Sequence, residues 1–233
     1  MIDLSRRSTE IETMDLPETS SADYARSLAD LARVNKVTMT HRAILDWLDR
    51  ATANAPKGAR IAILDIASGQ GDLLRAIRVW GLARGLRLVL TGLDLNPQSA
   101  AEAARATPEL MGINWQTGDV FEHIPNPAPD LIVSSQFTHH LDDDAVVAFL
   151  EWMELHATRG WLVADLHRHI VPYYGFRLLA RAMGWHRIVR IDGTISIARS
   201  FRKADWQGYL ARVGIAAEIS WWLPFRWCVG RLK

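Results

Sequence analysis

The feature that most constrains the fold is an apolar stretch that passes into a glycine-containing loop and then into an amphipathic segment. It reads ILDIASGQGDLL and spans residues 63–74. The continuous apolar run is typical of a strand buried on both faces, and Leu73 and Ile77 recur at helical spacing after the loop. Glycine tolerates backbone torsions and close contacts that a Cβ forbids. Gly69 and Gly71 therefore indicate a place where the backbone approaches a ligand closely.

The same alternation of apolar runs and amphipathic segments continues along the chain. Strands are predicted at 60–67, 86–95, 113–119, 130–136 and 160–166, and helices at 20–35, 97–106, 142–157 and 203–213. Further helices are predicted around the apolar residues of 44–48, ending before Pro56, around those of 73–80, and as an aromatic insert after the fifth strand. Strands that alternate with helices imply a parallel sheet with right-handed crossovers. The end of the chain, around Leu223-Pro224-Phe225, predicts an antiparallel hairpin. We expect an α/β, Rossmann-like fold: a seven-stranded, mostly parallel sheet with helices on both faces and an antiparallel C-terminal hairpin.

Composition excludes several classes of protein. The 27 basic and 26 acidic side chains nearly balance, so no nucleic-acid footprint is evident. A single cysteine, Cys228, excludes an intramolecular disulfide and fits a reducing compartment. The first 21 residues lack the apolar core of a signal peptide, and no stretch approaches the roughly 20 apolar residues of a membrane helix. We expect a cytoplasmic protein without membrane insertion or a nucleic-acid partner, and leave a homodimer open.

The glycine loop departs from a dinucleotide-binding fingerprint, which requires G-x-G-x-x-G before a helix. Here the pattern is Ala67-x-Gly69-x-Gly71, and Leu74 stands where the third glycine belongs. Asp72 at the helix start would repel a pyrophosphate. The loop therefore predicts a ligand without a pyrophosphate.

These residues resemble the class I S-adenosylmethionine-dependent methyltransferases. Asp65 followed by ASGQG matches the first motif of that family, with Ala67 in place of its first glycine. The resemblance implies S-adenosyl-L-methionine as the cofactor. It also implies that Asp65 lies near the cofactor's ammonium and that the loop passes under the aminoacyl part and the ribose.

Three later segments resemble further motifs of the family. LTGLDLN places Asp94, followed by Leu95, where an acid binds the ribose hydroxyls; TGDVF (117–121) offers Asp119 to the adenine amino group; PDLIVSSQFTHHL (129–141) supplies a strand and cofactor-facing positions. The resemblance thus implies the cofactor-binding residues Asp65, Ala67, Gly69, Gly71, Asp94, Leu95, Asp119, Val120 and Ser135.

The chain is more specifically similar to the ubiquinone/menaquinone-biosynthesis branch of small-molecule methyltransferases. The similar segments are LADLARVN, FTHHL, DLHRH and SIARSFRKADW. Gln136-Phe137 replaces the RN pair of the quinone enzymes, which points to another phenolic or enolic acceptor of secondary metabolism, polyketide- or quinol-like. We expect one domain over 1–233: a helical lid at 1–55 whose first 18 residues are frayed, a cofactor-binding core at 60–166, an acceptor-covering insert at 167–202, and a C-terminal helix and hairpin at 203–233.

Two histidine groups follow strands at the edge where the site must lie. Methyl transfer to a phenol requires deprotonation, and a histidine near neutrality lowers that barrier. His140 and His167 are the leading candidates for this base, with His139 beside them. The Asp165-x-His167-x-His169 pattern also suggests a metal site, but no carboxylate follows the fourth strand before Asp142, so we expect no metal.

The insert supplies candidate acceptor-binding residues. They are His169, Tyr173, Tyr174, Arg199 and Phe201, from an aromatic helix and the loop predicted after it. O-methylation with histidine-assisted deprotonation is the leading interpretation. C-methylation of a quinone or polyketide carbon, and a methyltransferase-like domain that binds the cofactor for interaction alone, remain alternatives.

Overall fold

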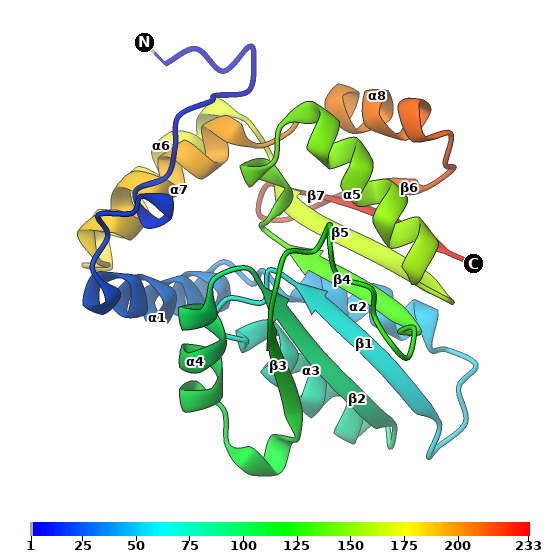
Figure 1. The fold of residues 1–233 in the computed structure, drawn as a ribbon. Coiled ribbons are helices and arrows are strands. Elements are labelled where there is room, and N and C mark those ends of the chain that lie inside the picture. The colour runs from blue at the N-terminus through cyan, green and yellow to red at the C-terminus, as the bar shows by residue number, and fades with distance from the viewer. Residues whose placement is uncertain (1) are drawn as a thin grey trace.

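The computed structural model describes residues 2–233 and has a seven-stranded sheet between layers of helices (Figure 1). Its strand order is β3-β2-β1-β4-β5-β7-β6. The strands are β1 (Arg60–Ile66), β2 (Arg87–Asp94), β3 (Ile113–Thr117), β4 (Leu131–Ser135), β5 (Gly160–Leu166), β6 (Glu218–Trp222) and β7 (Arg226–Leu232). Strands β1 to β5 pair in parallel, whereas β7 runs antiparallel to β5 and β6. The predicted fold is confirmed, including its terminal hairpin.

The helices cover both faces of the sheet. They are α1 (Ser21–Val37), α2 (Arg42–Ala51), α3 (Asp72–Ala83), α4 (Pro97–Ala106), α5 (Asp143–His156), α6 (Ile170–Ala182), α7 (Arg187–Arg199) and α8 (Lys203–Val213). Helices α2 and α3 pack on one face and α5 and α8 on the other. Because α2 buries Ile44, Trp47 and Leu48 in this core, it belongs to the sheet layers and not to a lid.

Strand β1 shows why the apolar run forms a central strand. Ile61 and Ile63 point into the cluster with α2 and α3, whereas Leu64 and Ile66 point into the cluster with α5 and α8. Side chains that alternate between two cores must be apolar on both faces, and each contributes about 1.5–3 kcal/mol by burial. The chain order reverses beside this strand, since β2 and β3 lie on one side and β4 and β5 on the other. A crevice opens at the carboxyl ends of strands at such a reversal.

The segment after β5 contains two helices where the sequence predicts one helix and a loop. Helix α7 was missed because its β-branched residues and a central glycine are weak helix formers. The glycine is explained by packing: a Cβ on Gly193 would lie 2.0 Å from Cε1 of Phe176 on α6. Close contact between α6 and α7 therefore overrides the weak local preference.

The prediction of a frayed N-terminus is wrong. Residues 2–20 run along α7 in Figure 1 and include a short turn of helix, η1 (Thr13–Asp15). Leu4 and Glu12 are buried. Arg7 donates to the backbone carbonyl oxygens of Leu141 (2.7 Å) and Arg199 (2.8 Å). We call residues 2–20 the N-terminal strap.

In the part of the chain that the structure describes, no helix has the length and apolar character needed to cross a membrane.

Candidate active site

A cavity of about 450 Å³ lies at the carboxyl ends of β1, β4 and β5. Its floor is the loop after β1 and the residues that end β4. Its walls come from the strap, from α1, α6 and α7, and from the turn between β6 and β7. Residues that are far apart in sequence thus face one shared space.

The glycine loop lies at this cavity, and its two glycines are required for different reasons. Ala67 and Gly69 line the cavity with φ angles of 59° and 50°. Gly71, with φ 74°, precedes α3 and does not line it. A Cβ on Gly71 would lie 2.1 Å from Trp115. Gly69 therefore leaves room for a ligand, whereas Gly71 leaves room for a tryptophan.

Three carboxylates surround the loop. Asp65 lines the cavity, and its pKa is raised well above the usual range by burial and by the charges of Asp72 and Asp94. Asp94 accepts hydrogen bonds from the backbone N–H of Gly69 (2.9 Å) and of Asn96 (3.0 Å). Asp94 therefore lies against the loop but does not line the cavity. Asp65 is the carboxylate that is available to a cationic ligand.

Of the other predicted cofactor residues, one lines the cavity and three do not. Ser135 lines the cavity, and its buried Oγ has no hydrogen-bond partner among the residues described. Leu95 and Asp119 are exposed and Val120 is buried in the core with α5, so none of these three lines the cavity. Near this edge α1 is tied to α4, because the hydroxyls of Tyr24 and Ser99 lie 2.7 Å apart.

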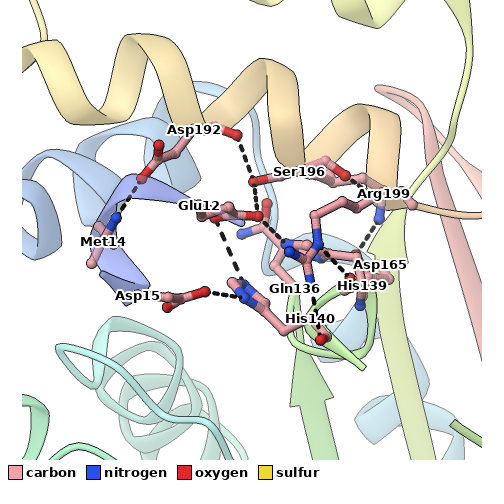
Figure 2. Close-up of polar contacts among 12 residues, drawn as sticks. Glu12, Met14, Asp15, Gln136, His139, His140, Asp165, Asp192, Ser196 and Arg199 are labelled. Carbon is pink, nitrogen blue, oxygen red and sulfur yellow. Dashed lines mark hydrogen bonds and ion pairs between the residues drawn. The ribbon is translucent and has the colours of Figure 1, made fainter. Parts of the chain in front are cut away.

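A polar cluster lies at the cavity, where the strap crosses the loop after β4 (Figure 2). His139 Nδ1 lies 2.7 Å from Oδ1 of Asp165, and its Nε2 lies 3.4 Å from Oε1 of Glu12. His140 Nδ1 lies 2.9 Å from Oδ2 of Asp15, and its Nε2 lies 3.8 Å from Oε2 of Glu12. One glutamate of the strap thus faces both histidines.

His139 carries a proton at neutral pH. Burial alone would lower its pKa, but Asp165 and Glu12 outweigh burial and raise the pKa to about 9. The same ion pair lowers the pKa of Asp165 to about 2 against the opposing effect of burial. A protonated imidazole cannot accept a proton, so the geometry favours His139 as a fixed positive charge and not as a base.

His167 lines the cavity in a different state. Burial, with the neighbouring charges of His169, Arg202 and Arg168, lowers its pKa to about 4. The indole N–H of Trp221 lies 3.3 Å from Nδ1 of His167. Since Nδ1 accepts this proton, we assign the ring proton to Nε2. His167 is then a neutral hydrogen-bond donor and a weak base.

The predicted acceptor residues do not line the cavity. His169 begins α6 by accepting the N–H of Val171 at Nδ1 (3.2 Å). The α6 residues that do line it are Val171, Pro172, Gly175, Phe176 and Leu179, so Tyr173 and Tyr174 face elsewhere. Phe201 is fully buried against Trp206 and Tyr209. The two tyrosines were misplaced because the sequence identifies a helix but not how it is rotated against its neighbours.

Arg199 also has a structural place. Its guanidinium donates to the backbone carbonyl oxygens of His139 (3.0 Å), His140 (2.8 Å) and Glu10 (2.7 Å). It therefore holds the loop after β4 that carries His139 and His140, called the histidine loop below, to the strap (Figure 2). Arg199 does not line the cavity.

Sequence reasoning missed the acidic residues of the strap. Glu12 reaches the cavity because Asp192 on α7 accepts the N–H of Thr13 and of Met14, both at 2.9 Å. Ser196 Oγ donates to Glu12 Oε1 at 2.8 Å. No local pattern marks an acid in a polar terminal segment for such a role.

Glu12, His139 and His140 also bring one ligand atom each within 4.8 Å of one another, a spacing that suits a metal ion.

Residues 63–160 match the family model described as "Methyltransferase domain". No curated protein matches the sequence of the chain.

Solved structures share the fold at low identity. Magnesium protoporphyrin IX methyltransferase from Synechocystis PCC 6803 with bound SAH has a TM-score of 0.56 at 16% identity, over 84% of this chain and 83% of that one. Human N-acetylserotonin methyltransferase in complex with SAM has a TM-score of 0.63 at 16% identity, over 92% and 56%. A SAM-dependent methyltransferase from Aquifex aeolicus has a TM-score of 0.61 at 13% identity, over 91% and 98%. Residues 63–160 thus match a methyltransferase domain, and the chain as a whole shares the fold of solved S-adenosylmethionine-dependent methyltransferases.

Proposed function

We propose that the chain methylates an ionisable oxygen of a flat, largely apolar small molecule, such as a phenol or an enol. One observation carries the proposal: the glycine loop and the cluster of Glu12, His139 and His140 face the same cavity. A cofactor on the loop and an acceptor beside the cluster would therefore share one cavity.

The residues around the loop fit S-adenosylmethionine. Asp65 is a buried carboxylate without a hydrogen-bonded or ion-paired partner among residues 2–233, and its raised pKa shows that a cation would stabilise it. Ser135 offers an unpartnered hydroxyl to the same cavity. We propose that Asp65 and Ser135 bind the amino-acid end and that Gly69 provides the close approach. The bound sulfonium would supply an electrophilic methyl carbon.

The rest of the cavity suits an aromatic acceptor. Val171, Pro172 and Phe176 of α6 line it, together with Pro224 and Phe225 of the terminal hairpin. Such walls exclude water and orient a flat molecule, and orientation alone can supply about 7–11 kcal/mol of the barrier. Two of the structural neighbours are named for small-molecule acceptors, magnesium protoporphyrin IX and N-acetylserotonin, which is consistent with this class.

We propose His140 as the base. His139 is protonated and His167 is a weak base, so His140 is the remaining histidine of the three. When Nδ1–H of His140 donates to Asp15, its Nε2 keeps a free lone pair beside Glu12. Asp15 then orients the ring, and Glu12 stabilises the imidazolium that forms, as a carboxylate does in other histidine-dependent sites.

The test has two stages. Calorimetry first measures binding of S-adenosylhomocysteine and of NAD to the wild type; binding of NAD alone would refute the cofactor assignment. A panel of phenols and enols is then assayed with S-adenosylmethionine, and product NMR distinguishes a methoxy from a C-methyl group.

The role of His140 is tested with His140→Gln, using His123→Gln, outside the cavity, as the matched control. We expect kcat to fall about 10²–10⁴-fold in H140Q, with unchanged affinity for S-adenosylhomocysteine. The loss shrinks for an acceptor acidic enough to be already ionised. Equal losses on both acceptors would show that His140 only shapes the cavity.

A further inference from the structure

Arg226 is a buried cation that the proposed reaction does not use. It begins β7, is 3% exposed and lines the cavity. Its guanidinium donates to Oε1 of Gln136 (3.2 Å) and to the hydroxyls of Thr38 (3.0 Å) and Thr40 (2.5 Å). Its buried Nε has no partner, and no carboxylate of residues 2–233 lies within 4 Å of its nitrogens.

Neutral partners do not compensate a buried guanidinium. Removing a charge from water is favourable only when an opposite charge or a full set of hydrogen bonds replaces the solvent. Burial lowers the pKa of Arg226 to about 10, because the loss of solvent destabilises its charged form. Asp165 acts on Arg226 only through space, because its oxygens accept from Thr138 and His139.

The other buried arginine, Arg168, is paired with a carboxylate. Arg168 is 2% exposed, and its guanidinium pairs with Oδ2 of Asp205 at 3.1 Å. It also donates to the carbonyl oxygens of Leu4 and Ser200. Arg168 does not line the cavity. The buried arginine that faces the cavity is therefore the one without a carboxylate.

We propose that Arg226 binds a carboxylate of a ligand inside the cavity, with Thr38 and Gln136 beside it. Two sources have this chemistry: the α-carboxylate of S-adenosylmethionine and a carboxylate on the acceptor. Asp65 lies on the same cavity and suits an ammonium, so the two residues together match the charges of an amino-acid end. The inference rests on the proposed function.

The test compares probes that differ in a carboxylate. Calorimetry measures S-adenosylhomocysteine and 5′-methylthioadenosine, which has the nucleoside but no carboxylate, on wild type, Arg226→Met and the control Arg168→Met. Loss of charge-assisted hydrogen bonds predicts about 10- to 100-fold weaker binding of S-adenosylhomocysteine to R226M. Methylthioadenosine should bind R226M as it binds the wild type. R168M should melt at a lower temperature but keep both affinities.

A second arm locates the carboxylate on the acceptor. It titrates 2-naphthoate and the neutral 2-naphthamide into protein saturated with S-adenosylhomocysteine. Weaker naphthoate binding by R226M, with unchanged S-adenosylhomocysteine binding, assigns Arg226 to the acceptor. If R226M does not fold, Arg226→Lys replaces it, since lysine keeps the charge but loses the planar fork. The preference for each carboxylate probe over its neutral counterpart should then fall by about threefold or more.

The outcomes separate this inference from the proposed function. If the variants bind S-adenosylhomocysteine and naphthoate as the wild type does, Arg226 only anchors Thr38, Thr40 and Gln136, and the inference is overturned. If the wild type binds neither S-adenosylhomocysteine nor methylthioadenosine, the proposed function itself fails.

Discussion

The charge on His139 makes a quantitative prediction about stability. Its pKa is about 9 in the folded protein, against about 6.5 in an unfolded chain. Folding therefore binds a proton tightly at this site. The stabilisation is complete below pH 6.5 and is lost as the pH rises through 9. A difference of about 2.5 units corresponds to about 3 kcal/mol at 1.36 kcal/mol per unit.

The assay is urea unfolding followed by tryptophan fluorescence between pH 6 and 9.5, on wild type and His139→Gln. We expect the free energy of unfolding of the wild type to fall by about 3 kcal/mol over this range. The variant should lack that part of the slope. Other groups contribute equally to both proteins, such as the buried Cys228 thiol, whose pKa is raised to about 12. The difference between the two curves therefore isolates His139.

Equal slopes would refute the reasoning, because they would mean that His139 is neutral in the folded protein. His139 would then return as a candidate base beside His140. At acidic pH the dependence has the opposite sign, so that stability falls as the pH falls. The pKa of Asp165 is lowered to about 2, so its contribution is present above about pH 4 and is lost as the pH falls through 2. Both changes describe one ion pair and are not summed.

Three further predictions follow from the loop and the cluster. Gly71→Ala should lower the free energy of unfolding by about 3 kcal/mol, because the added Cβ would clash with Trp115. Gly69→Ala should lower it by only about 1–2 kcal/mol, through backbone strain at a positive φ. Thermal unfolding that ranks the two variants the other way would contradict this. Asp94→Ala should weaken S-adenosylhomocysteine binding about tenfold or more in calorimetry while leaving the fold intact, because Asp94 holds the glycine loop through the N–H of Gly69, and unchanged affinity would reject this role. Activity should survive EDTA, because a protonated His139 cannot bind a metal; loss that Mg²⁺ or Zn²⁺ restores would instead assign a metal to the glutamate–histidine cluster.

The fold could be predicted because its signals are local. Each strand of the parallel sheet is a short apolar run, and each run ends where a small or polar residue begins a loop. The loop after β1 is also local, so Asp65, Ala67 and Gly69 could be placed at the cavity from twelve residues of sequence. The parallel pairing of β1 to β5 followed from the alternation of strands with helices.

The acceptor side could not be predicted in the same way. Glu12 and His139 lie 127 positions apart, and their contact depends on Asp192, which anchors the strap from a third segment. The rotation of α6 depends on Phe176 fitting against Gly193. Neither contact has a periodic signature, because each is a matter of packing between distant elements. Aromatic content therefore identified the right helix and the wrong side chains on it.

The assignment of Arg199 shows what such packing does for the site. Its planar fork binds three backbone carbonyl oxygens, two from the histidine loop and one from the strap. One guanidinium on α7 thus holds both the strap and the loop that carries His139 and His140. Since Glu12 and Asp15 belong to the strap, their contacts with the two histidines depend on the strap lying against α7. Packing between three distant segments therefore assembles the polar groups of the acceptor side.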